Sequence, residues 1–372
     1  MKIAHVLASP FFGGPERQAL GVARAMRPEA NSVFLTMQDG PRSAEFDDEA
    51  RSAGFEVHPL RNNWPHMLRC RREIADFVRS LRCDVVCTHG YKPDILGWMA
   101  ARAARVPAVS VAHGWTGATW KVRLNEWLDR QVMKRFDRVI GVSAMQSRRV
   151  RRAGVADDRI VTVLNAVDPD AMGKSDSGLR QQMVRPFKVE PTMLWIAAGR
   201  LSPEKGVDQL IDAFAMVRPR VPTACLLVYG DGPLRESLLA EVKKRDLQHA
   251  VHFAGHVRDL ERRLPQADGF VLPSRTEGLP VILLEAMAAG VVPVAFDVGG
   301  IGEVIADFQD GRLIEAGNIE ALADAMVRVS EDEAERGEMS EAARSKIDAR
   351  FTHADQATAY IEVFRSAMQR PS

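Results

Sequence analysis

The chain has 372 residues, 50 Lys and Arg against 49 Asp and Glu, and 46% hydrophobic residues. This length exceeds what one compact core usually holds, so we expect two domains of roughly 100–200 residues each. The composition is that of a globular protein. It excludes a low-complexity chain and, because no run of about 18 apolar residues occurs, a membrane-spanning one.

The net charge is unevenly distributed, at +8 for residues 1–180 and −7 for residues 181–372. A basic first half predicts an anionic partner there, and an uneven but merely solvated surface is the alternative. The N-terminal segment is too short in its apolar part to be a signal peptide. The four cysteines lack zinc or C-x-x-C spacing and are interpreted as thiols in a reducing compartment. We therefore expect a cytoplasmic protein without a nucleic-acid partner.

Short apolar runs alternate with amphipathic segments along the first half of the chain. The expected strands lie at 2–8, 32–37, 55–60, 84–90, 108–114, 138–143 and 160–167. The expected helices lie at 17–26, 44–54, 68–82, 94–106 and 122–135. Continuous apolar strands joined by helices are typical of a parallel sheet that is covered on both faces.

The same alternation restarts after a polar stretch that contains glycine and proline. The expected strands of the second half lie at 192–199, 223–230, 251–255, 268–273 and 291–296, and the expected helices at 207–218, 234–246, 281–290 and from about 318 to the end. We therefore predict an α/β protein with two doubly wound domains, 1–170 and 192–352, joined by a linker at 171–191. In such sheets, ligands bind at the carboxyl ends of the strands.

Three glycine-containing segments follow expected strands. In FFGGPER (11–17), Gly13 and Gly14 allow a ligand to approach the backbone near a helix start. In AAGRLSPEKG (197–206), Arg200 and Lys205 suit a diphosphate. In YGDGPLRESL (229–238), two glycines fit a close approach to a base or ribose. An ordinary surface turn is the alternative for each segment taken alone.

The segment SRTEGLPVILLEAMAAG (274–290) carries Glu277 and Glu285 in mostly apolar surroundings. Buried carboxylates are costly unless they are paired or hydrogen-bonded. We expect Pro280 at the first helical position, so that Gly278 and Leu279 lie near a helix start that can bind phosphate. Two carboxylates so placed could accept hydrogen bonds from hydroxyl groups on both sides of a diphosphate.

These motifs together resemble the retaining nucleotide-sugar glycosyltransferases of family 4, which have the GT-B fold of two Rossmann-like domains facing across a cleft. The resemblance covers essentially the whole chain and rests on GRLSPEKG, VYGDGP and the E-x7-E segment, supported by GGPER and LNAVD (164–168). Ala166 departs from the glycine that the family often has. The resemblance also implies that a C-terminal helix at about 353–372 packs back on the first domain.

The resemblance implies roles for particular residues. The reaction would be carried by His113, Glu277, Arg200 and Lys205. The donor nucleotide sugar would be bound by Gly13, Gly14, Gly199, Gly230, Gly232, Gly278, Leu279, Pro280 and Glu285, with Glu285 on the ribose. The acceptor would contact His89, Tyr91 and Lys92. No metal and no cofactor would be needed, and the Asp168-Pro169-Asp170 triplet, which mimics a metal motif, is interpreted as a decoy.

The expected reaction is transfer of a sugar from a nucleotide diphosphate, by default uridine diphosphate, to an acceptor hydroxyl with retained configuration. The alternatives are an epimerase or hydrolase of the same fold and a non-catalytic nucleotide-sugar-binding protein. Between Trp115 and Arg152 the chain has ten basic and three acidic residues, beside the apolar Trp120, Leu124, Trp127 and Leu128. This pattern predicts peripheral contact with an anionic membrane that carries a lipid-linked or glycan acceptor.

Overall fold

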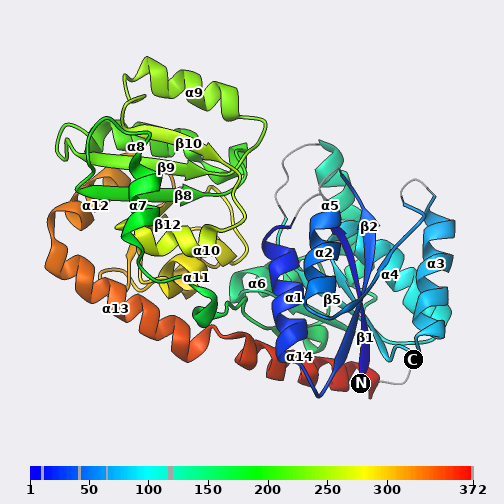
Figure 1. Cartoon of the computed structure of the whole chain (residues 1–372). Helices are drawn as coiled ribbons and strands as arrows, with labels where there is room; N and C mark the ends of the chain where they lie inside the picture. The colour runs from blue at the N-terminus through cyan, green and yellow to red at the C-terminus, as the bar shows by residue number, and fades with distance from the viewer. Residues whose placement is uncertain (10–11, 41–42, 64–65, 116–119, 370–372) are drawn as a thin grey trace. The chain divides into compact units, whose positions relative to one another are not determined.

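The computed structural model describes residues 1–9, 12–40, 43–63, 66–115 and 120–369 (Figure 1). Pro10 and Phe11, which precede the first glycine pair, lie outside the described residues, as do the side chains of Trp120 and Lys121. The chain divides into two compact units, Met1–Ala166 with His353–Ser372, and Val167–Thr352. None of the helices in the described ranges is long and apolar enough to cross a bilayer.

The first unit is built on a parallel sheet. Within the described residues its strands are β1 (Lys2–Ser9), β2 (Asn31–Gln38), β3 (Glu56–Pro59), β4 (Val85–His89), β5 (Ala108–Ala112), β6 (Arg138–Gly141) and β7 (Ile160–Thr162). Its helices are α1 (Gly14–Ala25), α2 (Ala44–Ser52), α3 (Met67–Ser80), α4 (Tyr91–Ala104), α5 (Trp120–Met133), α6 (Ala144–Arg152), η1 (Asp157–Arg159) and α14 (His353–Met368).

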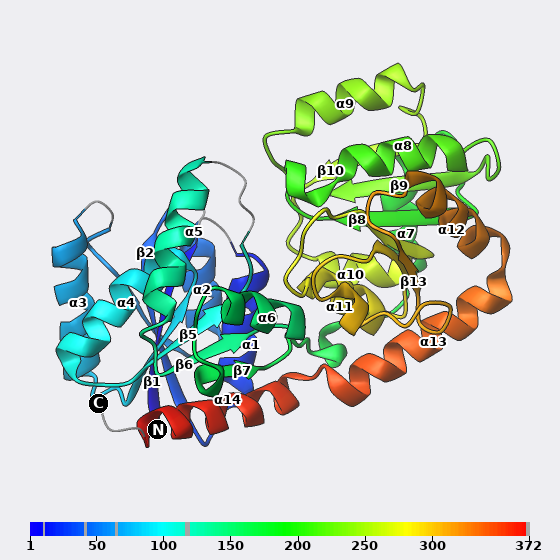
Figure 2. The same cartoon turned by 180° about the vertical axis from the view of Figure 1, so that it is seen from behind.

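The strands lie in the order β3-β2-β1-β4-β5-β6-β7. The chain adds β2 and β3 on one side of β1 and then β4 to β7 on the other side, so the direction in which it crosses the sheet reverses between β1 and β4. Alternate residues of β1 contribute to two core clusters, Ala4 and Val6 to one and Leu7 to the other. Helices α3, α4 and α5 lie side by side over the larger cluster (Figure 2). The two strands at the reversal, β1 and β4, are therefore central, and their carboxyl ends are where a doubly wound sheet binds ligands.

The C-terminal helix α14 belongs to the first unit and packs beside α1. A buried amide network fixes it: Gln18 Nε2 donates to Ala166 O at 2.6 Å, Ala166 N donates to Gln18 Oε1 at 2.9 Å, and Gln356 Nε2 donates to Gln18 Oε1 at 3.0 Å. Phe364 from the same helix is fully buried and meets the His5 ring edge-on. The first unit is thus completed by a helix that begins nearly two hundred residues after Ala166, where the rest of the unit ends.

The second unit is a second parallel sheet. Within the described residues its strands are β8 (Met193–Ala198), β9 (Ala224–Tyr229), β10 (Val251–Gly255), β11 (Gly269–Leu272), β12 (Val292–Phe296) and β13 (Arg312–Ile314). Its longer helices are α7 (Ser177–Val184), α8 (Val207–Val217), α9 (Arg235–Lys244), α11 (Val281–Ala288), α12 (Ile319–Glu331) and α13 (Glu333–Arg350). The shorter ones are η2 (Pro169–Ala171), η3 (Pro203–Lys205), α10 (Leu260–Arg263), η4 (Leu264–Gln266) and η5 (Ile301–Glu303).

The strand order of this sheet, β10-β9-β8-β11-β12-β13, reverses between β8 and β11. Its strands are short and almost wholly buried, with Trp195, Phe270 and Phe296 fully covered. The predicted α/β architecture with two doubly wound sheets is confirmed. In each unit the reversal puts two strand ends next to each other, and the loops that follow those strands hold candidate residues of that unit.

The polar stretch 171–191, which we expected to be a linker, contains helix α7 and is attached to the second unit. Asp176 caps this helix by accepting hydrogen bonds from Gly178 N at 2.9 Å and Leu179 N at 3.1 Å. Arg180 forms a hydrogen-bonded ion pair with Asp268 at 2.7 Å. The polar composition is therefore that of a capped surface helix. The expected strand 160–167 is also shorter, since β7 ends at Thr162.

Candidate functional site

In the second unit, an ion pair joins the loops that follow the two strands at the reversal. Lys205 Nζ lies 2.7 Å from Glu277 Oε1. Lys205 comes from the loop after β8 and Glu277 from the loop after β11, and these strands are neighbours in the sheet. The Glu277 side chain is 9% exposed and that of Lys205 is 27% exposed. A half-buried cation and a carboxylate thus share the ligand-binding edge of this sheet.

Close backbone packing sets the position of Lys205. The short helix η3 ends at Lys205, and Gly206 follows with a φ of +64°, in the left-handed region. A Cβ atom on Gly206 would lie 2.0 Å from Pro273 O, in the loop after β11. Because only glycine tolerates both the conformation and the contact, the EKG sequence brings the lysine against the loop that carries Glu277.

Glu277 is held by contacts with three residues, of which the sequence singles out Lys205 alone, and for a diphosphate rather than for this contact. Besides Lys205, Ser274 Oγ donates to Glu277 Oε1 at 2.6 Å. Gly299, with a φ of +61°, packs so tightly that a Cβ would lie 2.1 Å from Glu277 O. Gly300 N donates to Gly278 O at 2.7 Å. The serine that opens SRTEG and the glycine pair after β12 are thus supporting residues whose proximity no short motif reveals.

The loops that follow β8 and β11 are also joined by contacts between exposed residues at the protein surface. The Arg275 guanidinium forms a two-pronged pair with Asp208, at 2.8 and 2.5 Å, and donates to Pro203 O at 2.7 Å. Arg275 N donates to Glu204 O at 2.8 Å. The pKa of Asp208 is lowered by these hydrogen bonds from Arg275. The result is a rigid frame around the Lys205–Glu277 pair.

The remaining glycines of the predicted donor site are packed against each other. Gly230 has a φ of +120°, and a Cβ there would lie 1.9 Å from Gly199 O. A Cβ on Gly232 would lie 2.4 Å from Leu201 O. Gly199 N donates to Tyr229 O at 3.0 Å. The loops after β8 and β9 therefore form one surface, on which Gly199 and the neighbouring Arg200 are exposed.

Pro280 precedes helix α11 as its N-cap rather than opening it. We expected Pro280 as its first residue, whereas Pro280 is the N-cap, with extended backbone (φ −72°, ψ 120°), and the helix starts at Val281. Leu279 and Pro280 are buried, and Glu285 is 8% exposed despite its charge. A carboxylate that is this strongly buried is typical of a structural or binding residue, and the interpretation of Glu285 as an ordinary surface residue is excluded.

In the first unit, the predicted glycine pair lies at the start of α1. Gly13 is the N-cap and Gly14 the first helical residue. The N–H of Gly13 donates to Glu16 Oε2 at 3.0 Å, so a carboxylate of the same motif, 8% exposed, occupies the start of this helix. This contact was not foreseen from GGPER. Any anion that reaches the Gly13 amide would compete with Glu16.

The predicted acceptor residues occupy different environments. Tyr91 is partly exposed at the start of α4, and Lys92 Nζ forms an ion pair with Asp39, at 2.6 and 2.7 Å. His89, at the end of β4, is only 5% exposed, and each of its ring nitrogens lies 3.2 Å from another histidine, His5 or His113. That His89 touches an acceptor stays a prediction. Its ring is engaged in the interior with histidines from other strands, which the sequence alone did not indicate.

His113, just after β5, is partly buried beside His89. Burial lowers the pKa of His113 to about 4 and that of His5 to about 3. Burial, followed by the two neighbouring histidines, also lowers the pKa of His89 well below its usual value. All three imidazoles are thus neutral at physiological pH, and His113 would act through hydrogen bonds rather than through a positive charge.

Comparison with known proteins identifies the class. The family model of glycosyl transferases group 1 matches residues 181–346, and that of glycosyltransferase family 4 matches residues 12–171. The chain belongs to the group 1, family 4 glycosyltransferases of the GT-B fold. This confirms the resemblance drawn from the motifs.

Two relatives cover nearly the whole chain. One is the UDP-Gal:alpha-D-GlcNAc-diphosphoundecaprenol alpha-1,3-galactosyltransferase of Escherichia coli, 27% identical over 93% of this chain and 92% of that protein. The other is the GDP-mannose-dependent alpha-(1-6)-phosphatidylinositol monomannoside mannosyltransferase of Mycobacterium tuberculosis, 27% identical over 89% of this chain and 88% of that protein. These relatives support transfer of a hexose.

The fold also matches solved structures. The crystal structure of Anabaena Alr3699/HepE in complex with UDP-glucose superposes with a TM-score of 0.87 at 23% identity, covering 98% of this chain and all of that one. Sucrose-phosphate synthase from Thermosynechococcus elongatus superposes with a TM-score of 0.80 at 18% identity, over 98% of both chains. At these identities the likeness establishes the fold alone.

Proposed function

We propose that this glycosyltransferase moves a hexose from a uridine-diphosphate donor to an acceptor hydroxyl, with retention of configuration and without a metal ion. The observation that carries the proposal is the Lys205–Glu277 pair, 2.7 Å long, at the reversal of the second sheet. The names of the E. coli relative and of the Anabaena complex, which specify UDP-galactose and UDP-glucose, support uridine as the base.

The residues of the second unit can supply the chemistry that the donor needs. The Lys205 ammonium, with the exposed Arg200 guanidinium two residues after the end of β8, can neutralise the charge that develops on the departing diphosphate. Glu277 can accept hydrogen bonds from sugar hydroxyls, and Glu285 from the ribose. Fixed positive charge replaces a metal, and positioning of the two substrates accounts for much of the acceleration.

The acceptor that we propose is a lipid-linked glycan at an anionic membrane surface. Helix α5 exposes 51% of Leu124 and 53% of Trp127, three residues apart on one face, next to the exposed Arg123. The acidic Glu126 and Asp129 of the same helix are buried, at 5% and 2% exposure. The exposed face is thus apolar and basic, which suits a bilayer surface. The names of both relatives, which specify lipid acceptors, support this proposal.

One experiment tests donor, reaction type and metal requirement together. The purified chain is given UDP- and GDP-sugars, with and without a diphosphoundecaprenol-linked acceptor and with EDTA, and nucleotide release and product are measured. The expected result is UDP release that depends on the acceptor and persists in EDTA. NMR should show the same axial anomeric linkage in the product as in the donor. Release without acceptor would indicate a hydrolase or epimerase, binding without release a non-catalytic protein, and loss of activity in EDTA a metal enzyme.

A further inference from the structure

A row of polar side chains crosses the buried interior of the first unit. Ser32 lies on β2, His5 on β1, His89 at the end of β4, and His113 directly after β5. These four strands are consecutive in the sheet. Ser32 Oγ is 3.2 Å from His5 Nε2, His5 Nδ1 is 3.2 Å from His89 Nε2, and His89 Nδ1 is 3.2 Å from His113 Nε2. The row leads from a buried hydroxyl to the histidine of the predicted reaction site.

The row uses both ring nitrogens of His5 and both of His89. A neutral imidazole has one N–H donor and one acceptor nitrogen. Burial keeps His5, His89 and His113 neutral by lowering each pKa. The direction of one hydrogen bond therefore fixes the direction of the next, and only two arrangements exist. In one, His89 donates to His113; in the other, His113 donates to His89.

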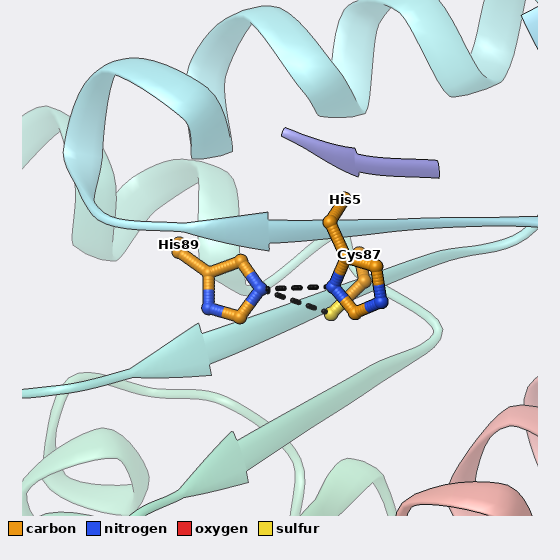
Figure 3. A group of neighbouring side chains, drawn as sticks. All are labelled: His5, Cys87 and His89. Atoms are coloured by element: carbon orange, nitrogen blue, oxygen red, sulfur yellow. Dashed lines mark hydrogen bonds between the residues drawn. The ribbon is translucent and has the colours of Figure 1, made fainter. Parts of the chain in front are cut away.

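The Ser32 hydroxyl distinguishes the two arrangements. Ser32 is 5% exposed, and among the described residues His5 Nε2 is the only hydrogen-bond partner of its Oγ. If His5 Nε2 carried a proton, Ser32 Oγ would accept it, and the buried hydroxyl hydrogen would be left without an acceptor, which is costly. Cys87 Sγ lies 3.7 Å from His89 Nε2, as Figure 3 shows, and it fits either arrangement because a thiol is both a weak donor and a weak acceptor.

We propose that Ser32, His5 and His89 hold His113 in the tautomer whose proton is on Nδ1, so that His113 presents a hydrogen-bond donor to a substrate oxygen. The hydrogen bonds run from Ser32 Oγ–H to His5 Nε2, from His5 Nδ1–H to His89 Nε2 and from His89 Nδ1–H to His113 Nε2. His5 and His89 are positioning residues. That the oxygen belongs to a sugar or phosphate rests on the proposed function, whereas the tautomer does not.

The same side chains could in principle ligate a transition metal, since the ligand atoms of His5, Cys87 and His89 lie within 4.8 Å of one another. The contacts favour the hydrogen-bonded row. The two ring nitrogens that would face a metal lie 3.2 Å apart, at hydrogen-bonding distance, and the row continues through the same two rings to Ser32 and to His113. Metal binding is therefore a rival that the experiment must separate.

The test reads the ring nitrogens directly. Long-range proton–nitrogen NMR spectra of the full chain labelled with 15N-histidine are assigned by single substitutions. We expect a protonated Nδ1 and an unprotonated Nε2 for His113. His5→Phe keeps an aromatic ring against Phe34 but removes both nitrogens, so the His113 signals should move toward a mixture of tautomers. Phe34→Leu disturbs the same packing without touching the row and should leave the tautomer unchanged.

Binding and kinetics separate this inference from the proposed function. In His5→Phe, UDP should still bind, because the donor loops lie in the other unit, while kcat falls about tenfold with little change in the donor KM. A His113 proton on Nε2 in the wild type, an unchanged tautomer in His5→Phe, or a stoichiometric metal that is lost in Cys87→Ser would each overturn the inference. If transfer activity were absent altogether, the NMR result would still decide it.

Discussion

Lys205 and Glu277 come from loops 72 residues apart in the chain, yet their side chains meet at 2.7 Å. The pair balances two charges that are largely removed from solvent. It also brings a cation and a carboxylate to the edge of the second sheet where the proposed donor would need both. Because Ser274 supports the carboxylate independently, the two residues can be tested separately.

Lys205→Ala should lower the rate of sugar transfer by roughly 10²–10³-fold, because the departing diphosphate loses a fixed positive charge. Glu277→Ala should abolish transfer while the chain stays folded. Nucleotide release and circular dichroism give the two measurements. The matched control is Lys243→Ala on α9, which removes an exposed lysine. Activity within twofold of the wild type in Lys205→Ala would remove Lys205 from the mechanism.

Gly230→Ala should destabilise the second unit by at least about 2 kcal/mol, since it combines a positive φ with a Cβ that meets Gly199 O at 1.9 Å. Gly337 in α13 has no atom within 4 Å of its would-be Cβ. Gly337→Ala should therefore stabilise the protein by about 0.5–1 kcal/mol. Denaturant unfolding measures both. Equal effects of the two substitutions would show that the packing of Gly230 has been overestimated.

The buried histidines predict acid sensitivity of the first unit. Their folded pKa values are lowered, to about 3 for His5 and about 4 for His113. The unfolded chain then binds more protons than the folded one below about pH 6.5, so their contribution to stability is complete above that pH and is lost as the pH falls. Asp94 and Asp129 act in the opposite sense, because burial raises their pKa values and favours folding in acid.

A difference measurement isolates the histidine contribution. Relative to the wild type, His5→Phe should gain roughly 1 kcal/mol in stability for each pH unit below 6.5, because one fewer proton is taken up on unfolding. Hydrogen exchange at β1 and β4 amides follows the opening of this unit across the pH range. A constant difference between the two proteins from pH 7 to 5 would mean that His5 is protonated in the folded state.

The double substitution Leu124→Ser and Trp127→Ser should weaken binding to anionic vesicles by tenfold or more, since both apolar side chains would insert at the bilayer surface. Co-sedimentation with anionic and with neutral lipid provides the measurement. The control is Leu239→Ser on α9, an exposed apolar residue in the second unit. Equal binding to both kinds of lipid would remove the membrane from the proposal.

The strands and the donor loops could be predicted because their determinants are local. Continuous apolar runs gave β8, β9 and β11 within a residue or two, and the loops with Lys205 and Glu277 follow them directly. Strand β13 escaped prediction because it has three residues, including the charged Arg312, which pairs with Asp307 at 3.0 Å. Helix α7 escaped because its stability comes from a cap and from contacts with the second unit rather than from an apolar stripe.

The row of histidines could not be predicted from spacing. His5 and His89 are 84 residues apart, and His89 and His113 are 24 apart. They meet only because the sheet order sets β1, β4 and β5 side by side, and His5 in particular stood in an apolar run without any motif. A predicted sheet order, with each histidine assigned to a face, is the one route by which sequence reasoning could have joined them.

The second unit begins and ends at one place. Val167 N donates to Phe351 O at 2.9 Å, and Val167 forms a β-bridge with Thr352. The unit therefore has the topology of a domain inserted into a host, with its two ends side by side. Because Ala166 and His353 follow directly from these two ends, a short turn between them could replace residues 167–352 in the chain. A unit joined to the rest of the chain at one place can be exchanged as a block, and under the proposed function such an exchange would change the nucleotide sugar that is used.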